Sequence, residues 1–72
     1  MKDKECFDCL KFYYDEGRGV HIMQENKIWV NGIIVLLKED HCVIEDRVLG
    51  CKVIFFKDIF EVSEYREKKW LA

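Results

Sequence analysis

The chain has 72 residues, half of them hydrophobic and 14% aromatic, and carries a formal charge of −2 at pH 7. This length predicts one domain, residues 1–72, that buries only about 60% of its unfolded surface and is marginally stable alone. The acidic balance argues against a non-specific nucleic-acid binder, which is normally basic. The first residues lack the apolar segment of a secretory signal, and no apolar run reaches membrane-spanning length. We therefore expect a soluble, cytoplasmic protein.

The first predicted element is a helix over residues 4–16. Asp3 is a suitable N-cap, and Gly17 follows the last turn. Between them, Cys6 and Leu10 lie on one apolar face of the helix. The apolar arc is wide, which predicts that the helix covers an open end of the remaining fold.

A long apolar strand dominates the rest of the sequence. The ten residues from Ile28 to Leu37 contain five β-branched aliphatic side chains and no charge, a composition typical of a strand. Gly32 lies near its centre, where a glycine indicates a bulge or a bend. A short turn at Glu25-Asn26 precedes this strand, because asparagine tolerates the left-handed conformation that tight hairpins need.

Five strands are expected, and they cover residues 20–24, 27–37, 42–45, 51–56 and 59–62. Short turns place consecutive strands side by side and antiparallel, and closure into a barrel removes exposed edges. The predicted fold is mainly β, with an N-terminal helix and a five-stranded, strongly bent, antiparallel SH3-type barrel over residues 20–62. Residues 63–72 are predicted to form a tail with a helical turn capped by Ser63, on which Trp70 and Leu71 dock.

The four cysteines allow two interpretations. Cys6 and Cys9 have the spacing of half a zinc site, which Cys42 and Cys51 would complete in a small metal-binding domain. Cysteine is also a small, readily buried hydrophobic residue, and the apolar surroundings favour that interpretation. We therefore expect no metal and no cofactor.

No motif for catalysis is present in the sequence. It contains no glycine-rich phosphate loop, no nucleophile motif and no obvious pair of catalytic carboxylates, so we expect a non-enzymatic protein. His21 is interpreted as a strand residue on the polar face. Trp29, Phe55, Phe56 and Phe60 form an aromatic-rich set that suits a core or a subunit interface better than base stacking.

From residue 20 to residue 63 the chain resembles the Sm/LSm family, whose bacterial branch includes Hfq. The resemblance rests on Gly32 followed by the segment from Leu36 to Asp46, and on Gly50 followed by the apolar run and tight turn that end at Val62. It implies an Sm-like barrel. It also implies a homo-oligomeric ring, in which the fourth strand of one copy pairs with the fifth strand of the next.

The resemblance also implies site residues. Its RNA-contacting turns correspond here to Asp40, His41, Phe55, Phe56 and Lys57. Leu37 takes the place of a base-reading aspartate, and His41 that of an asparagine. The implied subunit interface comprises Val53, Ile54, Phe55, Ile59, Phe60 and Val62.

Two functional hypotheses follow. The leading one is an oligomeric, non-enzymatic Sm-like protein that binds RNA or a ribonucleoprotein partner. The alternative is a protein–protein interaction or assembly module that has an Sm-like barrel without its base-reading residues.

Overall fold

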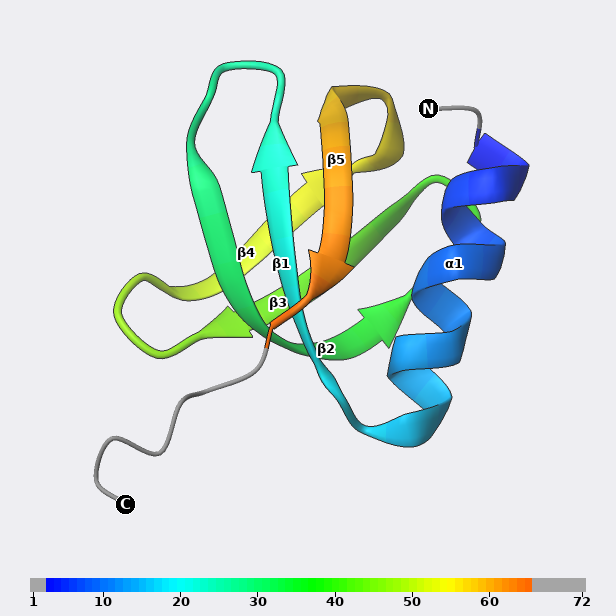
Figure 1. The fold of residues 1–72 in the computed structure, drawn as a ribbon, viewed down its shortest axis with the longest axis horizontal. Coiled ribbons are helices and arrows are strands. Elements are labelled where there is room, and N and C mark those ends of the chain that lie inside the picture. The colour runs from blue at the N-terminus through cyan, green and yellow to red at the C-terminus, as the bar shows by residue number, and fades with distance from the viewer. Residues whose placement is uncertain (1–2, 66–72) are drawn as a thin grey trace.

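The computed structural model describes residues 3–65, in which one helix precedes a single five-stranded antiparallel sheet (Figure 1). The elements are α1 (Asp3–Glu16), β1 (Gly19–Gln24), β2 (Trp29–Leu37), β3 (His41–Asp46), β4 (Gly50–Phe55), the short 3-10 helix η1 (Phe56–Asp58) and β5 (Ile59–Glu64). The strand order in the sheet is β4-β3-β2-β1-β5. The predicted fold class, a helix followed by five bent antiparallel strands, is confirmed.

Helix α1 is followed directly by a glycine and packs against β2 and η1 (Figure 1). Gly17 has a φ of 66°, a left-handed conformation that glycine adopts without steric cost. The next amide, Arg18 N–H, donates to the carbonyl of Tyr13 at 3.0 Å and closes the last turn. The helix contributes Cys6 and Leu10 to the core, and both are fully buried.

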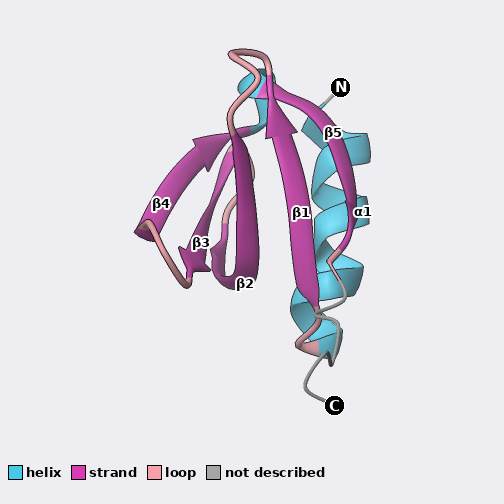
Figure 2. Ribbon diagram, turned by 60° about the vertical axis from the view of Figure 1, so that its left-hand side comes forward, coloured by secondary structure: helices cyan, strands magenta, loops and turns pink. Residues whose placement is uncertain are grey.

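Strand β2 belongs to both halves of the sheet. Its residues 29–33 pair with β1, and its residues 32–37 pair with β3. Gly32 lies in the overlap, opposite Val20 on one side and Asp46 on the other. The sheet curves around this point, and β4 and β5 come together at η1 and diverge toward their other ends (Figure 2).

The backbone of β3 explains why a glycine occupies position 32. A Cβ atom there would overlap the carbonyl oxygen of Glu45 and lie 2.7 Å from its carbonyl carbon. No backbone atom can yield that much space without breaking the pairing of β2 with β3. The register irregularity of β2 is a separate feature at Val35, between Ile34 and Leu36. The bend is thus at the glycine, and the bulge lies three residues later.

The core is built from alternate residues of the strands and from two turns of the helix. These side chains are at most 4% exposed, and they form one cluster: Cys6, Leu10, Val20, Ile22, Val30, Ile34, Cys42, Ile44, Ile54, Phe56 and Ile59. Burial of such side chains is worth about 1.5–3 kcal/mol each for the larger ones. The core of this small domain therefore consists almost entirely of aliphatic residues, with Phe56 as its one fully buried aromatic ring among the described residues.

The turn between β1 and β2 differs from the expected one. Lys27, not Asn26, takes the left-handed conformation, with a φ of 69°. Asn26 uses its side chain instead, and its Oδ1 accepts a hydrogen bond from Ile28 N–H at 3.0 Å. The strand consequently begins at Trp29, two residues later than predicted.

Strand β5 is longer than predicted. Ser63 pairs with His21, and Glu64 pairs with Val20, so the expectation that Ser63 caps a helical turn is wrong. The reason is that β1 begins at Gly19 and offers backbone partners to both residues. The pairing continues with a 3.0 Å hydrogen bond from Tyr65 N–H to the carbonyl of Gly19. The predicted docking of Trp70 and Leu71 concerns residues outside the described part of the chain.

Substitution of Gly32 by alanine tests the close approach of β3 to β2. The added methyl group would collide with the Glu45 carbonyl, and we expect the free energy of unfolding to fall by at least about 2 kcal/mol. Urea denaturation followed by circular dichroism measures the change. Val35→Ala, on the same strand but half exposed, is the control and should cost less than about 1 kcal/mol. Equal effects of the two substitutions would contradict this account of the bend.

Candidate ligand-binding surfaces and subunit interface

The structure brings His41 and Phe55 together, as the predicted RNA site requires. His41 opens β3 and Phe55 ends β4, and the two residues pair across the strands. Their ring centroids lie 5.4 Å apart with an interplanar angle of 47°. The Nδ1–H of His41 donates to the Asp40 carboxylate at 2.7 Å, which orients the imidazole. The Phe55 ring is 43% exposed, so one aromatic face remains available to a ligand.

The backbone links the turn before β3 to η1. Phe56 N–H donates to the carbonyl of Asp40 at 2.9 Å, so the two turns implicated by the sequence lie side by side. Lys57, on η1, is exposed. A shallow pocket beside this cluster is lined by residues of α1 and of the β2–β3 turn, namely Phe7, Leu37, Lys38, Glu39, Asp40 and His41. We refer to Asp40, His41, Phe55 and Lys57 as the His41 cluster.

One member of the predicted RNA site has a different role. Phe56 is fully buried, so the prediction that its side chain contacts RNA is wrong. The chain turns into η1 directly after β4, and Phe56 continues the inward direction of Ile54, two residues earlier. Alternate residues of a strand face inward and outward, and this alternation was the sequence signal that predicts a buried Phe56 beside an exposed Phe55.

The predicted interface residues divide in the same way. Val53 and Phe60 are 57% and 56% exposed, and Val62 is partly buried against the core. Ile54 and Ile59 are fully buried, so the prediction that their side chains contact another copy is wrong. Both face inward and fill the core of their own barrel.

Strands β4 and β5 are the two edges of the sheet. Within residues 3–65, β4 pairs only with β3, and β5 pairs only with β1. Each edge strand presents a row of backbone groups that another strand can pair with. Val53 and Phe60 on these strands are exposed and apolar, and the charged residues Lys52 and Glu61 lie beside them.

A second aromatic group lies on the outer face of β1 and β2, and sequence analysis missed it. His21 stacks on Trp29 with ring centroids 3.7 Å apart and an angle of 14°, and its other neighbour is Tyr65 at 6.1 Å. The Nδ1 of His21 also hydrogen-bonds Asn31 Oδ1 on the neighbouring strand. Trp29 therefore belongs to this stack and not to the predicted group of phenylalanines.

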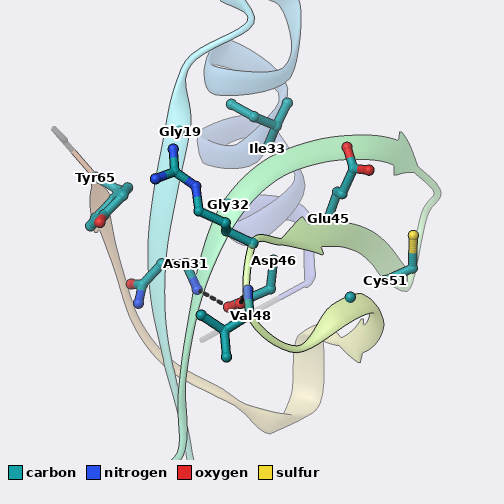
Figure 3. A pocket seen from close by; sticks show the side chains of 11 residues that line it. Gly19, Asn31, Gly32, Ile33, Glu45, Asp46, Val48, Cys51 and Tyr65 are labelled. Carbon is teal, nitrogen blue, oxygen red and sulfur yellow. Dashed lines mark hydrogen bonds between the residues drawn. The ribbon is translucent and has the colours of Figure 1, made fainter.

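Next to this stack is a groove of about 620 Å³, where the β3–β4 turn diverges from β1 and β2 (Figure 3). Asp46 forms its floor and is only 7% exposed. Its carboxylate accepts hydrogen bonds from the backbone N–H groups of Asn31 at 3.0 Å, Val48 at 2.7 Å and Leu49 at 2.9 Å. These bonds lower the pKa of the Asp46 carboxyl below its ordinary value of 3.8, and the bond from Leu49 has the largest effect. Asp46 is thus ionised at neutral pH and ties the turn to β2.

The cysteines are spread over the fold. Cys6 and Cys42 are buried, Cys9 is half-buried and Cys51 is exposed. Burial raises the pKa of Cys42 to about 12, with a smaller contribution from Cys6 nearby, so this thiol is unreactive at neutral pH. The interpretation of all four as buried hydrophobic residues is correct for two of them. In the described part of the chain, no three cysteine, histidine or acidic side chains come together as a metal site.

Comparison with known proteins places the fold in a class. The arrangement of α1 and the five bent strands is that of an Sm-like barrel. It is similar to the 1.55 Å crystal structure of Hfq, a pleiotropic translational regulator, with a TM-score of 0.69 and 12% sequence identity. The match covers 78% of this chain and 92% of that one. The predicted Sm-like, Hfq-like fold is confirmed.

Sequence comparisons give no match of their own. No family model and no curated protein matches the chain. At 12% identity, the similarity concerns the fold alone. A search of residues 3–65 for helices long and apolar enough to cross a membrane finds none.

Replacement of Asp46 by asparagine tests its role in holding the groove. The substitution removes the charge that accepts three backbone N–H groups, and we expect a loss of about 1–3 kcal/mol in unfolding free energy at neutral pH. Because the pKa is lowered on folding, this contribution is complete above the unfolded pKa and is lost as the pH falls through the lower, folded pKa. The stability difference between the parent protein and the variant should therefore shrink below pH 3.8.

Urea titrations of both proteins, at neutral pH and in acid, measure this difference. Asp58→Asn removes an exposed carboxylate and is the matched control, expected to change stability by less than about 0.5 kcal/mol. A loss for Asp46→Asn that does not depend on pH would contradict the ionised, hydrogen-bonded state.

Proposed function

We propose that the protein is a non-enzymatic Sm-like protein that assembles into a closed ring and binds single-stranded RNA at the His41 cluster. The observation that carries the proposal is the pair of open edges, β4 and β5, on a barrel that resembles Hfq in fold. Pairing of β4 with β5 of the next copy uses two different surfaces, so the assembly closes only as a ring. Such pairing satisfies the backbone groups at both edges at once.

The side chains at the edges support this assembly. Val53 and Phe60 each leave more than half of their surface exposed in a single copy. Exposed apolar side chains on both edges of a sheet are typical of an interface between copies. The small size of the domain adds to the argument, since oligomerisation is one of the few ways to bury more apolar surface.

RNA binding rests on the chemistry of the His41 cluster. The exposed ring of Phe55, beside the partly exposed His41, suits unpaired bases, which proteins bind by stacking on aromatic rings. Lys57 and the neighbouring Lys38 offer two cations for phosphates. The neighbouring Asp40 and Glu39 are exposed and acidic, so the affinity comes mainly from stacking. Binding should then depend only weakly on salt, because few phosphates are neutralised.

A second candidate function is a protein assembly module that binds no RNA. It is favoured by Leu37, which stands where the Sm family carries a base-reading aspartate, and by Phe56, whose ring is in the core. Titration of fluorescent oligo-U and oligo-A at two salt concentrations distinguishes the two. Saturable binding of at least one oligonucleotide supports RNA binding, and no binding of either favours the assembly module.

Substitutions at the edges test the ring. We expect the parent protein to be a discrete oligomer in size-exclusion chromatography with light scattering. Val53→Lys and Phe60→Lys should each shift it to monomers, because they place charges in the paired edges without disturbing the core. Val35→Lys, on the central strand β2 and also half exposed, should leave the oligomer intact. A parent protein that is monomeric at micromolar concentration would refute the ring.

Replacement of Phe55 by leucine tests the stacking surface. Leucine keeps an apolar side chain and the neighbouring interface but removes the aromatic face, so we expect RNA affinity to fall about 5-fold or more. Fluorescence anisotropy with the oligonucleotide that binds the parent protein measures the loss. Phe12→Leu, at an exposed aromatic residue of α1, is the control and should bind RNA like the parent. If Phe55→Leu also binds normally while remaining oligomeric, the His41 cluster is not the RNA site.

A further inference from the structure

Asp40 is held in a fixed position at the edge of the exposed aromatic surface. Its backbone carbonyl accepts a hydrogen bond from Phe56 N–H at 2.9 Å, and its Oδ1 accepts one from His41 Nδ1–H at 2.7 Å. The His41 ring lies in turn 5.4 Å from the ring of Phe55, measured between centroids. The carboxylate of Asp40 therefore lies next to the surface on which a stacked base would rest.

This carboxylate still has an acceptor to offer. The side chain of Asp40 is 66% exposed, and its second oxygen, Oδ2, makes no hydrogen bond within residues 3–65. A carboxylate accepts hydrogen bonds through both oxygens and donates none. Because His41 and the Phe56 amide already orient Asp40, a ligand that donates to Oδ2 pays little entropy to order it.

The RNA bases differ in what they can offer such an acceptor. Cytosine and adenine carry an exocyclic amino group, which donates, and carboxylates pair with the amino group of cytosine in known complexes. Uracil has a carbonyl oxygen in place of that amino group, and its one N–H donor lies between two carbonyl oxygens. A uracil stacked beside Asp40 would bring two acceptors together, and neither would regain the hydrogen bond that it lost from water.

The neighbouring cations do not reverse this selection. Lys38 lines the shallow pocket beside His41, and Lys57 is exposed on η1. Their ammonium groups pair with phosphates, and phosphate contacts carry no sequence information. The two lysines therefore add affinity to every RNA sequence alike.

We propose that Asp40 is the base-selecting residue of the His41 cluster, and that the site binds cytosine and adenine in preference to uracil. The base stacks on Phe55, and its amino group donates to Asp40 Oδ2. His41 is a positioning residue that holds the carboxylate in place. This selection rests on the proposed RNA-binding function of the same site and names the class of base that it takes.

Fluorescence anisotropy with labelled oligo-C, oligo-A and oligo-U of equal length, at neutral pH and one salt concentration, tests the selection. Oligo-C and oligo-U are the matched pair, because their pyrimidine rings are almost the same size and the amino group is the main difference. We expect the parent protein to bind oligo-C and oligo-A at least about 5-fold more tightly than oligo-U. Asp40→Asn should bring the ratio of oligo-C to oligo-U affinity close to one, since an amide both donates and accepts.

The ratio is the readout because loss of a negative charge strengthens phosphate binding equally for all three oligonucleotides. Glu39→Gln removes the same charge from the neighbouring exposed residue and should keep the ratio of the parent protein. Thermal unfolding by circular dichroism checks that both variants are folded.

Three results would overturn the selection while RNA binding stands. They are oligo-U binding as tight as oligo-C binding in the parent protein, a preference that survives Asp40→Asn, and a preference that Glu39→Gln abolishes as well. Failure of all three oligonucleotides to bind the parent protein would instead overturn the RNA-binding function, and the selection with it.

Discussion

The close approach of the β3 backbone to Gly32 is the constraint on which the rest of the structure depends. Because no side chain fits between the strands at this point, β2 can bend and pair with β1 along its first half and with β3 along its second half. The bend turns a flat five-stranded sheet into a small barrel around an aliphatic core. Strands β4 and β5 stand at the two ends of the strand order. They are the edges that we expect to join neighbouring copies.

Strand β3 separates the two candidate surfaces. His41 begins the strand and supports the exposed ring of Phe55, whereas Asp46 ends it and holds the β3–β4 turn over the groove. The first surface is aromatic with two nearby lysines, Lys38 and Lys57, which suits stacked bases. The second is lined by the carboxylates of Glu45 and Asp46 and by the exposed apolar side chains of Ile33 and Val48. One strand therefore presents two different surfaces at its two ends.

Much of the fold is predictable from the sequence because local patterns determine it. The apolar face of α1, the glycine in β2 and the short turns are sufficient to predict one helix, five strands and their antiparallel order. The candidate site was predictable only in part. Its residues are brought together by the pairing register of the strands, which the sequence pattern does not specify. The stack of His21 on Trp29 is a diagonal contact between two strands, and the groove gathers residues from four strands, the β3–β4 turn and Tyr65. Phe55 and Phe56 are adjacent and chemically identical, yet Phe55 is exposed and Phe56 is buried, because Phe56 continues the inward direction of Ile54.

The central claim is that this barrel joins further copies through β4 and β5. Native mass spectrometry of the full chain tests it most directly, because it counts the copies. We expect a single dominant species whose mass is a whole multiple, greater than two, of the 8.7 kDa chain, as a closed ring requires. A spectrum dominated by the 8.7 kDa monomer at micromolar concentration, or by a ladder of all sizes without a closed species, would contradict the claim.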